Sequence, residues 1–338
     1  MKRIFICSAI LLLATAQVGA RTVELTLYPA KATEPAQKYQ LLPKAEELTD
    51  ADAVPLYQKA IQSLPQDFQP KQFSDWRSLP PDQLRVKEVE SALKKLEPLL
   101  GLLTQATRSK QCNWPFVKPG QVSQQFMDDL SKYRQFGFIL DVQAKLQIEQ
   151  GQYQQSRETL KASLSMAKHL GDAPTLVQGL VGIAIAALNL SRTEQWIQSD
   201  NAPNLYWALE DLPQPLVDMT KAIKIEIDNL KNYNILLRRQ FEKQLKPAHD
   251  RVLKQMNYVD RKIAALQSIE ALRHYAASHN GKFPNELSDV TEVPVPIDPV
   301  TQKPFIYRRA GSKAALEAAA SKGAKAKDAM RYLLNLKE

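Results

Sequence analysis

The most regular hydrophobic pattern in the chain covers residues 138–190 and predicts three consecutive helices at the centre of the core. In the first two helices, apolar residues recur at intervals of three or four, as they do on the buried face of a helix. Gly151 ends the first helix, and the segment from Gly171 to Pro174 ends the second, because these residues favour turns.

The third of these helices, which begins near Leu176, has apolar residues on more than one face. Because little polar surface remains, we expect other helices to surround it and make it the central strut of the core. Its two neighbouring stripes are formed by Leu176, Leu180, Ile183, Ala187 and Leu190, and by Val177, Val181, Ala184 and Leu188.

A long antiparallel helix pair is predicted downstream. Apolar residues between positions 216 and 241 follow the helical period, and Lys246-Pro247 interrupts this pattern. The period then continues over residues 252–266 with spacings of three and four, which is typical of a coiled-coil seam. We therefore expect two helices that fold back on each other at Pro247, although an open protrusion is an alternative.

Residues 21–81, in the N-terminal part of the chain, have a weaker pattern of apolar and polar residues. Alternating apolar residues predict a strand over Thr22–Tyr28, and Asp50 is expected to cap a short helix that runs through Ile61. Residues 64–81 contain several prolines and are interpreted as an ordered loop that wraps the core. Its aromatic residues are expected to fill a hydrophobic groove; they are Phe68, Phe73 and Trp76.

The remaining chain divides into a helical domain, residues 82–279, and a small module, residues 280–338. The first begins with a helix over positions 82–109 that bends at Pro98. Asn280-Gly281 stops the last long helix. The strands expected in the module are Phe305–Arg309, Ala314–Ala318 and Met330–Leu336, although the middle segment favours helix by propensity.

Two features at residues 144–164 resemble a hairpin of the tetratricopeptide repeat family: Gly151 lies at the turn and Tyr153 opens the second helix. A true array repeats every 34 residues or so, but positions 185–187 hold Ile-Ala-Ala in place of a second Gly-x-Tyr. The sequence therefore predicts a mainly α protein: an irregular, TPR-like helical-hairpin bundle with a long antiparallel helix pair and a small C-terminal α+β module.

The first twenty residues match a secretory signal peptide. Lys2 and Arg3 precede an apolar run of about 13 residues, too short for a membrane span, and small residues end at Ala20. We expect cleavage after Ala20, a periplasmic or secreted protein, and no stable membrane span in the mature chain. Retention of this segment as an anchor is the alternative.

Charge and cysteine content narrow the function classes. Removing Lys2 and Arg3 leaves 43 basic against 36 acidic residues, an excess of +7 that is interspersed along the helices as on a solvated face. No basic-aromatic motif supports nucleic-acid binding. The mature chain keeps one cysteine, Cys112, which we expect to be buried beside Trp114 because no activating base is near in sequence.

The sequence contains no recognisable catalytic or metal-binding pattern. His274 and His279 are five positions apart and so miss the spacing that places two ligands on one helical face. No glycine-rich phosphate loop, nucleophile elbow or Cys/His dyad is present. The adjacent acids Asp128-Asp129 and Glu210-Asp211 diverge on a helix, unlike the paired carboxylates of glycosidases. We therefore predict no enzyme activity, no metal site and no cofactor.

Several motifs carry a family resemblance. The peptide at 203–209 (PNLYWAL) with Leu-Pro at 212–213, Cys-Asn-Trp at 112–114 and the segment DPVTQKPFIYR at 298–308 resemble a family of uncharacterised secreted proteins of planctomycete bacteria. That resemblance implies location and architecture only. Residues 270–284 followed by 298–308 are also similar to the globular end of type II secretion pseudopilins, whose N-terminal methylation motif is absent here.

Two functional hypotheses follow. The first is a helical scaffold that binds an unidentified envelope protein, and the alternative is an accessory component of a type II-like secretion system; a carbohydrate-active enzyme is a third. The candidate partner-binding residues are Tyr206 and Trp207, in the most distinctive peptide. Neighbouring helical positions point about 100° apart, so we expect the rings to face different ways, with Trp207 mainly packed in the core. The oligomeric state stays open.

Overall fold

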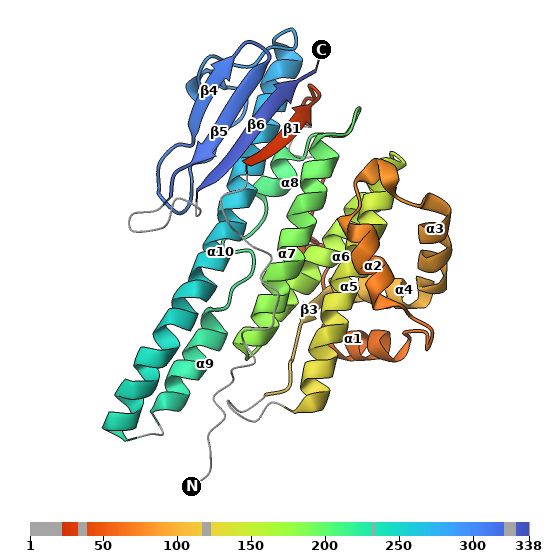
Figure 1. The fold of residues 1–338 in the computed structure, drawn as a ribbon, viewed down its shortest axis with the longest axis vertical. Coiled ribbons are helices and arrows are strands. Elements are labelled where there is room, and N and C mark those ends of the chain that lie inside the picture. The colour runs from red at the N-terminus through yellow and green to blue at the C-terminus, as the bar shows by residue number, and fades with distance from the viewer. Residues whose placement is uncertain (1–21, 33–38, 117–122, 232–233, 321–328, 338) are drawn as a thin grey trace.

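The structure is a computed structural model, and it is mainly helical with a small sheet that includes the C-terminal strands, which confirms the predicted fold class (Figure 1). The predicted signal peptide, Met1–Ala20, lies outside the residues that the structure describes. The described ranges are 22–32, 39–116, 123–231, 234–320 and 329–337.

The three central helices are confirmed as α5 (Gln124–Glu149), α6 (Tyr153–Gly171) and α7 (Leu176–Ile197). Gly151 makes the turn between the first two with a φ of 68°, a conformation that costs little only for glycine. Helices α6 and α7 approach closely, because a Cβ on Gly182 would lie 2.5 Å from the carbonyl oxygen of Ala167.

Helix α7 lies at the centre of the bundle and contacts α5, α6 and two later helices, as predicted for the central strut. One face stays partly open, where Ala184 is exposed and its neighbours are half-buried. Within the described residues, α7 alone is long and apolar enough to cross a membrane, and 61% of its apolar window is buried. A mostly buried core helix passes the same test. The half-buried neighbours are Val177, Leu180, Ala187 and Leu188.

The N-terminal segment contains more helix than its sequence pattern predicts. Helix α1 (Ala53–Gln62) is capped by Asp52, not Asp50, because the Asp52 carboxylate accepts the N–H of Val54. The predicted wrapping loop contains α2 (Pro70–Ser78), since Pro70 suits the first turn of a helix. Helix α2 packs on α5 and buries Phe73 and Trp76, as expected of the aromatics in this segment.

The helix predicted over 82–109 is two helices, α3 (Val86–Lys95) and α4 (Glu97–Thr107). Pro98 occupies the first turn of α4, where its missing N–H costs nothing, so it starts a helix instead of bending one. The chain then enters β3 (Ser109–Gln111), which pairs in parallel with β2 (Thr49–Asp52). These short polar strands have no hydrophobic alternation that would predict them.

The long antiparallel pair exists, but its turn is elsewhere. Helix α9 (Thr220–Leu230) ends early, and α10 (Ile235–Ser278) runs through Pro247 without interruption. Pro247 lies inside α10, where a proline loses one backbone hydrogen bond and crowds the carbonyl of residue 243 but does not have to end a long helix. The chain therefore reverses between the end of α9 at Leu230 and the start of α10 at Ile235. A short helix, α8 (Tyr206–Glu210), precedes the pair and packs on α10.

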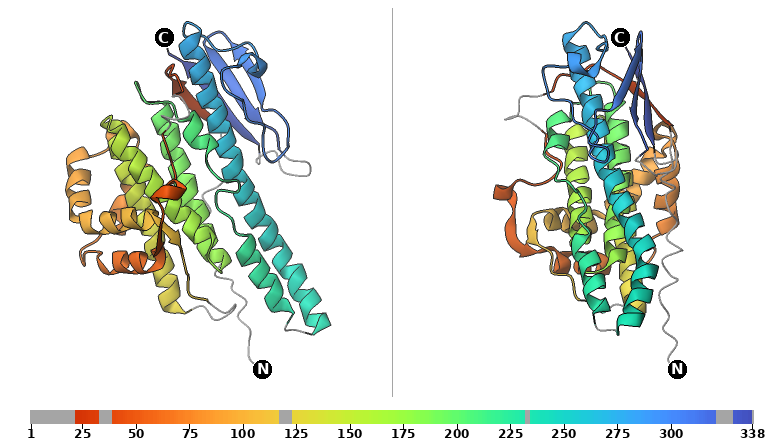
Figure 2. Two further views of the ribbon diagram at one scale, coloured as in Figure 1. Left: turned by 180° about the vertical axis from the view of Figure 1, so that it is seen from behind. Right: turned by 90° about the vertical axis from the view of Figure 1, so that its left-hand side faces the viewer.

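The predicted C-terminal strands are confirmed as β4 (Ile306–Ala310), β5 (Lys313–Ala318) and β6 (Met330–Leu336), which form an antiparallel meander. The fourth strand is β1 (Thr22–Leu27), which pairs in parallel with β6 in the order β1-β6-β5-β4. The sheet thus joins segments that the sequence assigns to separate units, 21–81 and 280–338. Figure 2 shows this sheet beside the C-terminal end of α10.

Candidate functional site

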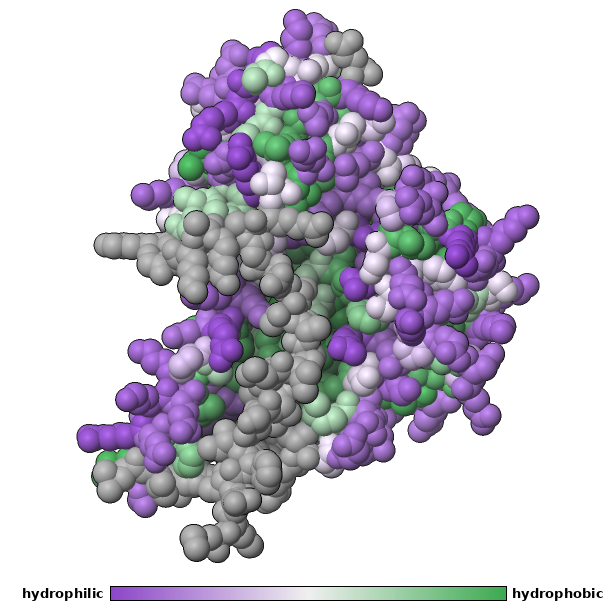
Figure 3. Space-filling view, viewed as in Figure 1, coloured by the Kyte–Doolittle hydropathy of each residue, from purple (hydrophilic) through white to green (hydrophobic). Residues whose placement is uncertain are grey.

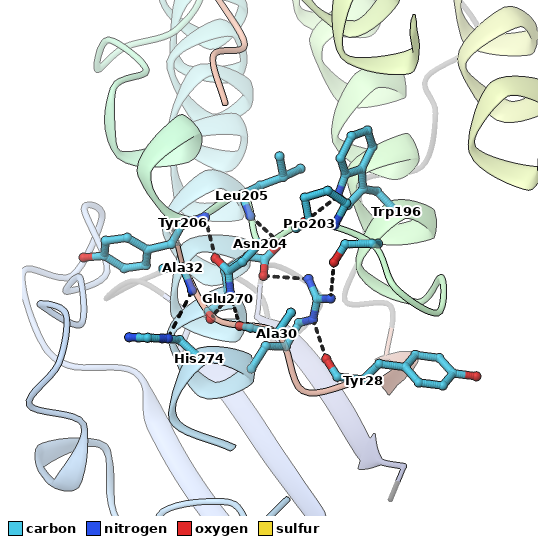
Figure 4. Close-up of polar contacts among 12 residues, drawn as sticks. Tyr28, Ala30, Ala32, Trp196, Pro203, Asn204, Leu205, Tyr206, Glu270 and His274 are labelled. Carbon is cyan, nitrogen blue, oxygen red and sulfur yellow. Dashed lines mark hydrogen bonds and ion pairs between the residues drawn. The ribbon is translucent and has the colours of Figure 1, made fainter. Parts of the chain in front are cut away.

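The distinctive peptide that contains Tyr206 lies between α7 and α10, where two charged residues of α10 are completely buried (Figure 4). Glu270 and Arg273 are both 0% exposed and form an ion pair of 2.8 Å. Arg273 also donates hydrogen bonds to the carbonyl oxygens of Tyr28 at 2.9 Å and Ala202 at 3.0 Å. The guanidinium therefore joins α10 to the N-terminal segment and to the start of the peptide.

The carboxylate of Glu270 and the amide of Asn204 complete this junction. Glu270 accepts the N–H of Leu205 at 3.0 Å, while Asn204 donates to the carbonyl oxygens of Ala30 and Glu270, each at 2.9 Å. The Asn204 side chain also accepts the N–H of Tyr206, the first residue of α8, at 2.9 Å. Burial raises the pKa of Glu270, and Arg273 and the Leu205 N–H counteract this by stabilising the charged form.

Two further side chains fix the borders of the junction. His274, on the next position of α10, accepts the N–H of Ala32 through Nδ1 at 3.1 Å, and its partial burial lowers its pKa. Trp196, at the end of α7, donates from Nε1 to the carbonyl oxygen of Pro203 at 2.7 Å. The peptide is therefore held by side chains from both flanking helices.

Tyr206 is not available to a partner, because it is 1% exposed and its hydroxyl donates to the carbonyl oxygen of Pro294. Trp207 is half-buried. The expectation that the two rings face different ways is wrong: their centroids lie 4.9 Å apart in an edge-to-face contact. The Cα–Cβ bonds diverge, but these long side chains bend back toward each other. Of the two candidate residues, only Trp207 presents surface.

Because Trp207 is only half-buried, its replacement by alanine should cost about 2 kcal/mol of unfolding free energy, roughly half the loss for a fully buried tryptophan. Chemical denaturation measures this loss. Tyr206→Phe is the matched comparison and should cost about 1–2 kcal/mol, since it keeps the ring and removes only the hydroxyl with its hydrogen bonds to Pro294 and Gln267. An unchanged midpoint for Trp207→Ala would contradict a packing role.

The structure does not bring the other candidate groups together. Asp128 and Asp129 each accept a hydrogen bond from a glutamine four positions earlier on α5. No group of three or more metal-ligating side chains occurs within the part of the chain that the structure describes. The prediction that Cys112 is buried is only half right: it packs on the core but is half-exposed, and burial raises the pKa of its thiol.

The residues that sequence reasoning missed are Glu270 and Arg273. Charged residues spaced three apart on a helix ordinarily lie on a solvated face, and the sequence pattern predicts a solvated face for these two residues as well. A signal was present nonetheless, because both lie in a stretch, 263–276, whose other residues are largely alanine, leucine and isoleucine. A charged pair within such a stretch is a candidate for a buried ion pair.

Comparison with family models, with curated proteins and with solved structures found no match to this chain. The resemblance of the motif at 203–209 to a planctomycete family therefore stays a prediction, as does the resemblance of the C-terminal part to pseudopilins. The function of this chain is therefore inferred from its own residues.

Proposed function

We propose that this chain is a secreted or periplasmic helical scaffold that binds another protein of the cell envelope. The observation that carries the proposal is the partly open apolar face of α7. The central helix of a bundle normally has all its apolar faces covered, and an exposed apolar patch commonly marks an interaction surface.

This face runs from Val177 to Leu188, a distance of about 16 Å or three helical turns. It borders the hollow between the α9–α10 pair and the helices α5 and α6, and Figure 3 shows hydrophobic residues at the bottom of that hollow. An amphipathic helix of the partner is the occupant that fits, because three turns of a helix place apolar residues at three- and four-residue intervals against such a face.

Photo-crosslinking in the native envelope tests this proposal. A photoreactive residue at Leu180 or Ala184 should capture one defined envelope protein, while the same residue at Lys94, exposed on α3, should not. Within the crosslinked complex, this chain itself should begin at Arg21 if export removes residues 1–20. Equal capture from Lys94, or crosslinks only within the chain, would contradict a binding role for the α7 face.

A second candidate function is an accessory role in a type II-like secretion system. The observation that favours it is the order of elements at the C-terminal end, where the long helix α10 leads into the antiparallel strands β4, β5 and β6. The two proposals differ in their genetic context, because the secretion role requires secretion genes beside the gene for this chain.

A further inference from the structure

Much of the excess positive charge of the chain lies in one region, the arm, which we define as residues 220–231 and 234–254. It comprises α9 and the first half of α10 and contains nine Lys or Arg residues against four Asp or Glu residues, a net charge of +5 out of +9 for the whole chain. Figure 1 shows α9 and the first half of α10 diverging from the other helices toward one side of the molecule. An element with this charge attracts anions.

The cations of the arm are concentrated on one face of α10. Four basic residues and one acidic residue, Asp250, fall within about 80° of the helix circumference and extend over about 22 Å. All five are exposed. The basic residues of this face, which we call the basic face, are Arg239, Lys243, Lys246 and Lys254.

Other contacts within the arm leave the basic face uncompensated. Three of the four acidic residues are occupied elsewhere: Asp228 pairs with Lys231 at 2.6 Å, Glu242 with Arg238 at 2.7 Å, and Glu226 with His249 at 2.9 Å. As far as the described residues extend, none of the four cations of the basic face forms an ion pair. Only Asp250 offsets them, so the face keeps a net charge of +3.

Apolar side chains accompany this charge. Ile235, the first residue of α10, is 71% exposed, and Ile227 on α9 is 41% exposed close to the same end of the arm. Leu253 is 43% exposed and lies five helical turns beyond Ile235, on the same side of α10. Exposed isoleucines at the end of an arm contribute nothing to folding of the body, but they suit insertion into a lipid interface.

We propose that the arm docks on an anionic membrane surface, with the basic face against lipid headgroups and Ile227 and Ile235 in the interfacial layer. A membrane fits better than an acidic protein for two reasons. Three of the four cations are lysines, which protein interfaces disfavour but which attract anionic lipids. The combination of a basic patch with inserted apolar groups also supplies the two signals that stable peripheral binding requires. This inference goes beyond the proposed scaffold function and uses a different surface.

Vesicle co-sedimentation of the full chain tests the proposal. At about 0.1 M salt, the wild type should partition at least tenfold more strongly onto vesicles of phosphatidylcholine with roughly 30% phosphatidylglycerol than onto pure phosphatidylcholine vesicles, and high salt should abolish this preference. Replacing the four cations of the basic face by glutamine should weaken binding to anionic vesicles at least tenfold, and up to about a thousandfold if each charge contributes about 1 kcal/mol. Because every variant retains residues 1–20, their contribution is common to all.

The matched control replaces four exposed lysines of α1, α2 and α3 by glutamine and changes the net charge equally. Its anionic-vesicle binding should stay within about twofold of the wild type.

The paired variant Ile227→Ser/Ile235→Ser should weaken binding by about tenfold while leaving the salt dependence of binding unchanged. Equal losses in the basic-face and control variants, or no preference of the wild type for anionic vesicles, would overturn the proposal. The lysines of the control are Lys59, Lys71, Lys87 and Lys94.

Discussion

Replacing Glu270 by alanine is expected to lower the free energy of unfolding by about 3–5 kcal/mol, because it leaves the Arg273 guanidinium buried without its counter-ion. The same change removes the acceptor of the Leu205 N–H. Chemical denaturation at neutral pH measures the loss. The effect should be large because Arg273 has no exposed surface through which water could replace the lost carboxylate.

Glu242→Ala is the matched control, since Glu242 lies on the same helix and pairs with Arg238 at 2.7 Å on an exposed surface. Exposed pairs of this kind contribute less than about 1 kcal/mol. Glu270→Gln should fall between the two, because glutamine keeps an acceptor for Leu205 but lacks the charge. A loss for Glu270→Ala no larger than that for Glu242→Ala would show that the ion pair is not what holds the junction.

The hydrophobic pattern was sufficient to predict the helices and strands whose buried residues recur at one regular helical or strand interval. The three central helices and the three C-terminal strands are all where their apolar residues predict them, even though Ala314–Ala318 favours helix by propensity. There, pairing with β4 and β6 outweighs the intrinsic preference of alanine. Local pattern therefore identified elements, but not which elements meet.

Long-range pairing explains most of what the sequence could not supply. Nothing in residues 22–27 indicates that β1 will pair with β6, more than three hundred positions away, since a half-buried strand looks the same in any sheet. The prediction that the helix ends at Pro247 was wrong for a different reason. A proline inside a helix loses one backbone hydrogen bond and crowds the preceding turn, and a long helix such as α10 can continue past it when the rest of its length is stabilised by packing.

In the candidate site, too, the sequence indicates local features but not the long-range contacts. Tyr206 and Trp207 stand out in the sequence, and they do lie at a junction of four segments, but Glu270 and Arg273 of α10 hold that junction together. The positions of charged and aromatic residues along the chain do not by themselves distinguish a buried ion pair from a solvated one, or a packed aromatic from an exposed one. Both distinctions arise from contacts between α7, α8, α10 and the N-terminal segment.

A second buried polar group lies on the opposite side of the bundle. His169 of α6 is 7% exposed, and its Nδ1 lies 2.7 Å from the hydroxyl of Tyr57 on α1. A hydrogen bond to the backbone of Ser109 occupies the imidazole as well. These contacts suit a neutral ring that donates from one nitrogen and accepts at the other. Trp114 stacks on Tyr57 and donates to the carbonyl oxygen of His169, so the site is closed by aromatic rings.

Burial lowers the pKa of His169 from 6.5 to about 4, and the nearby Lys168 adds to this effect. The unfolded chain therefore takes up a proton near pH 6.5 that the folded chain accepts only near pH 4. The contribution to stability is complete above pH 6.5 and is lost as the pH falls toward 4. Asp260 acts in the opposite sense, because burial raises its pKa to about 6 and its protonation stabilises the folded state over an overlapping range.

Because these two groups oppose each other, the wild type alone would not reveal the histidine, and a variant is needed. His169→Asn should shift the unfolding free energy at about pH 4.5, relative to that at about pH 7, by about 2 kcal/mol in favour of pH 4.5, in addition to any uniform loss from altered packing. Urea denaturation at both pH values measures this difference. If His169→Asn lowered stability equally at both pH values, His169 would not be the buried neutral group that resists protonation.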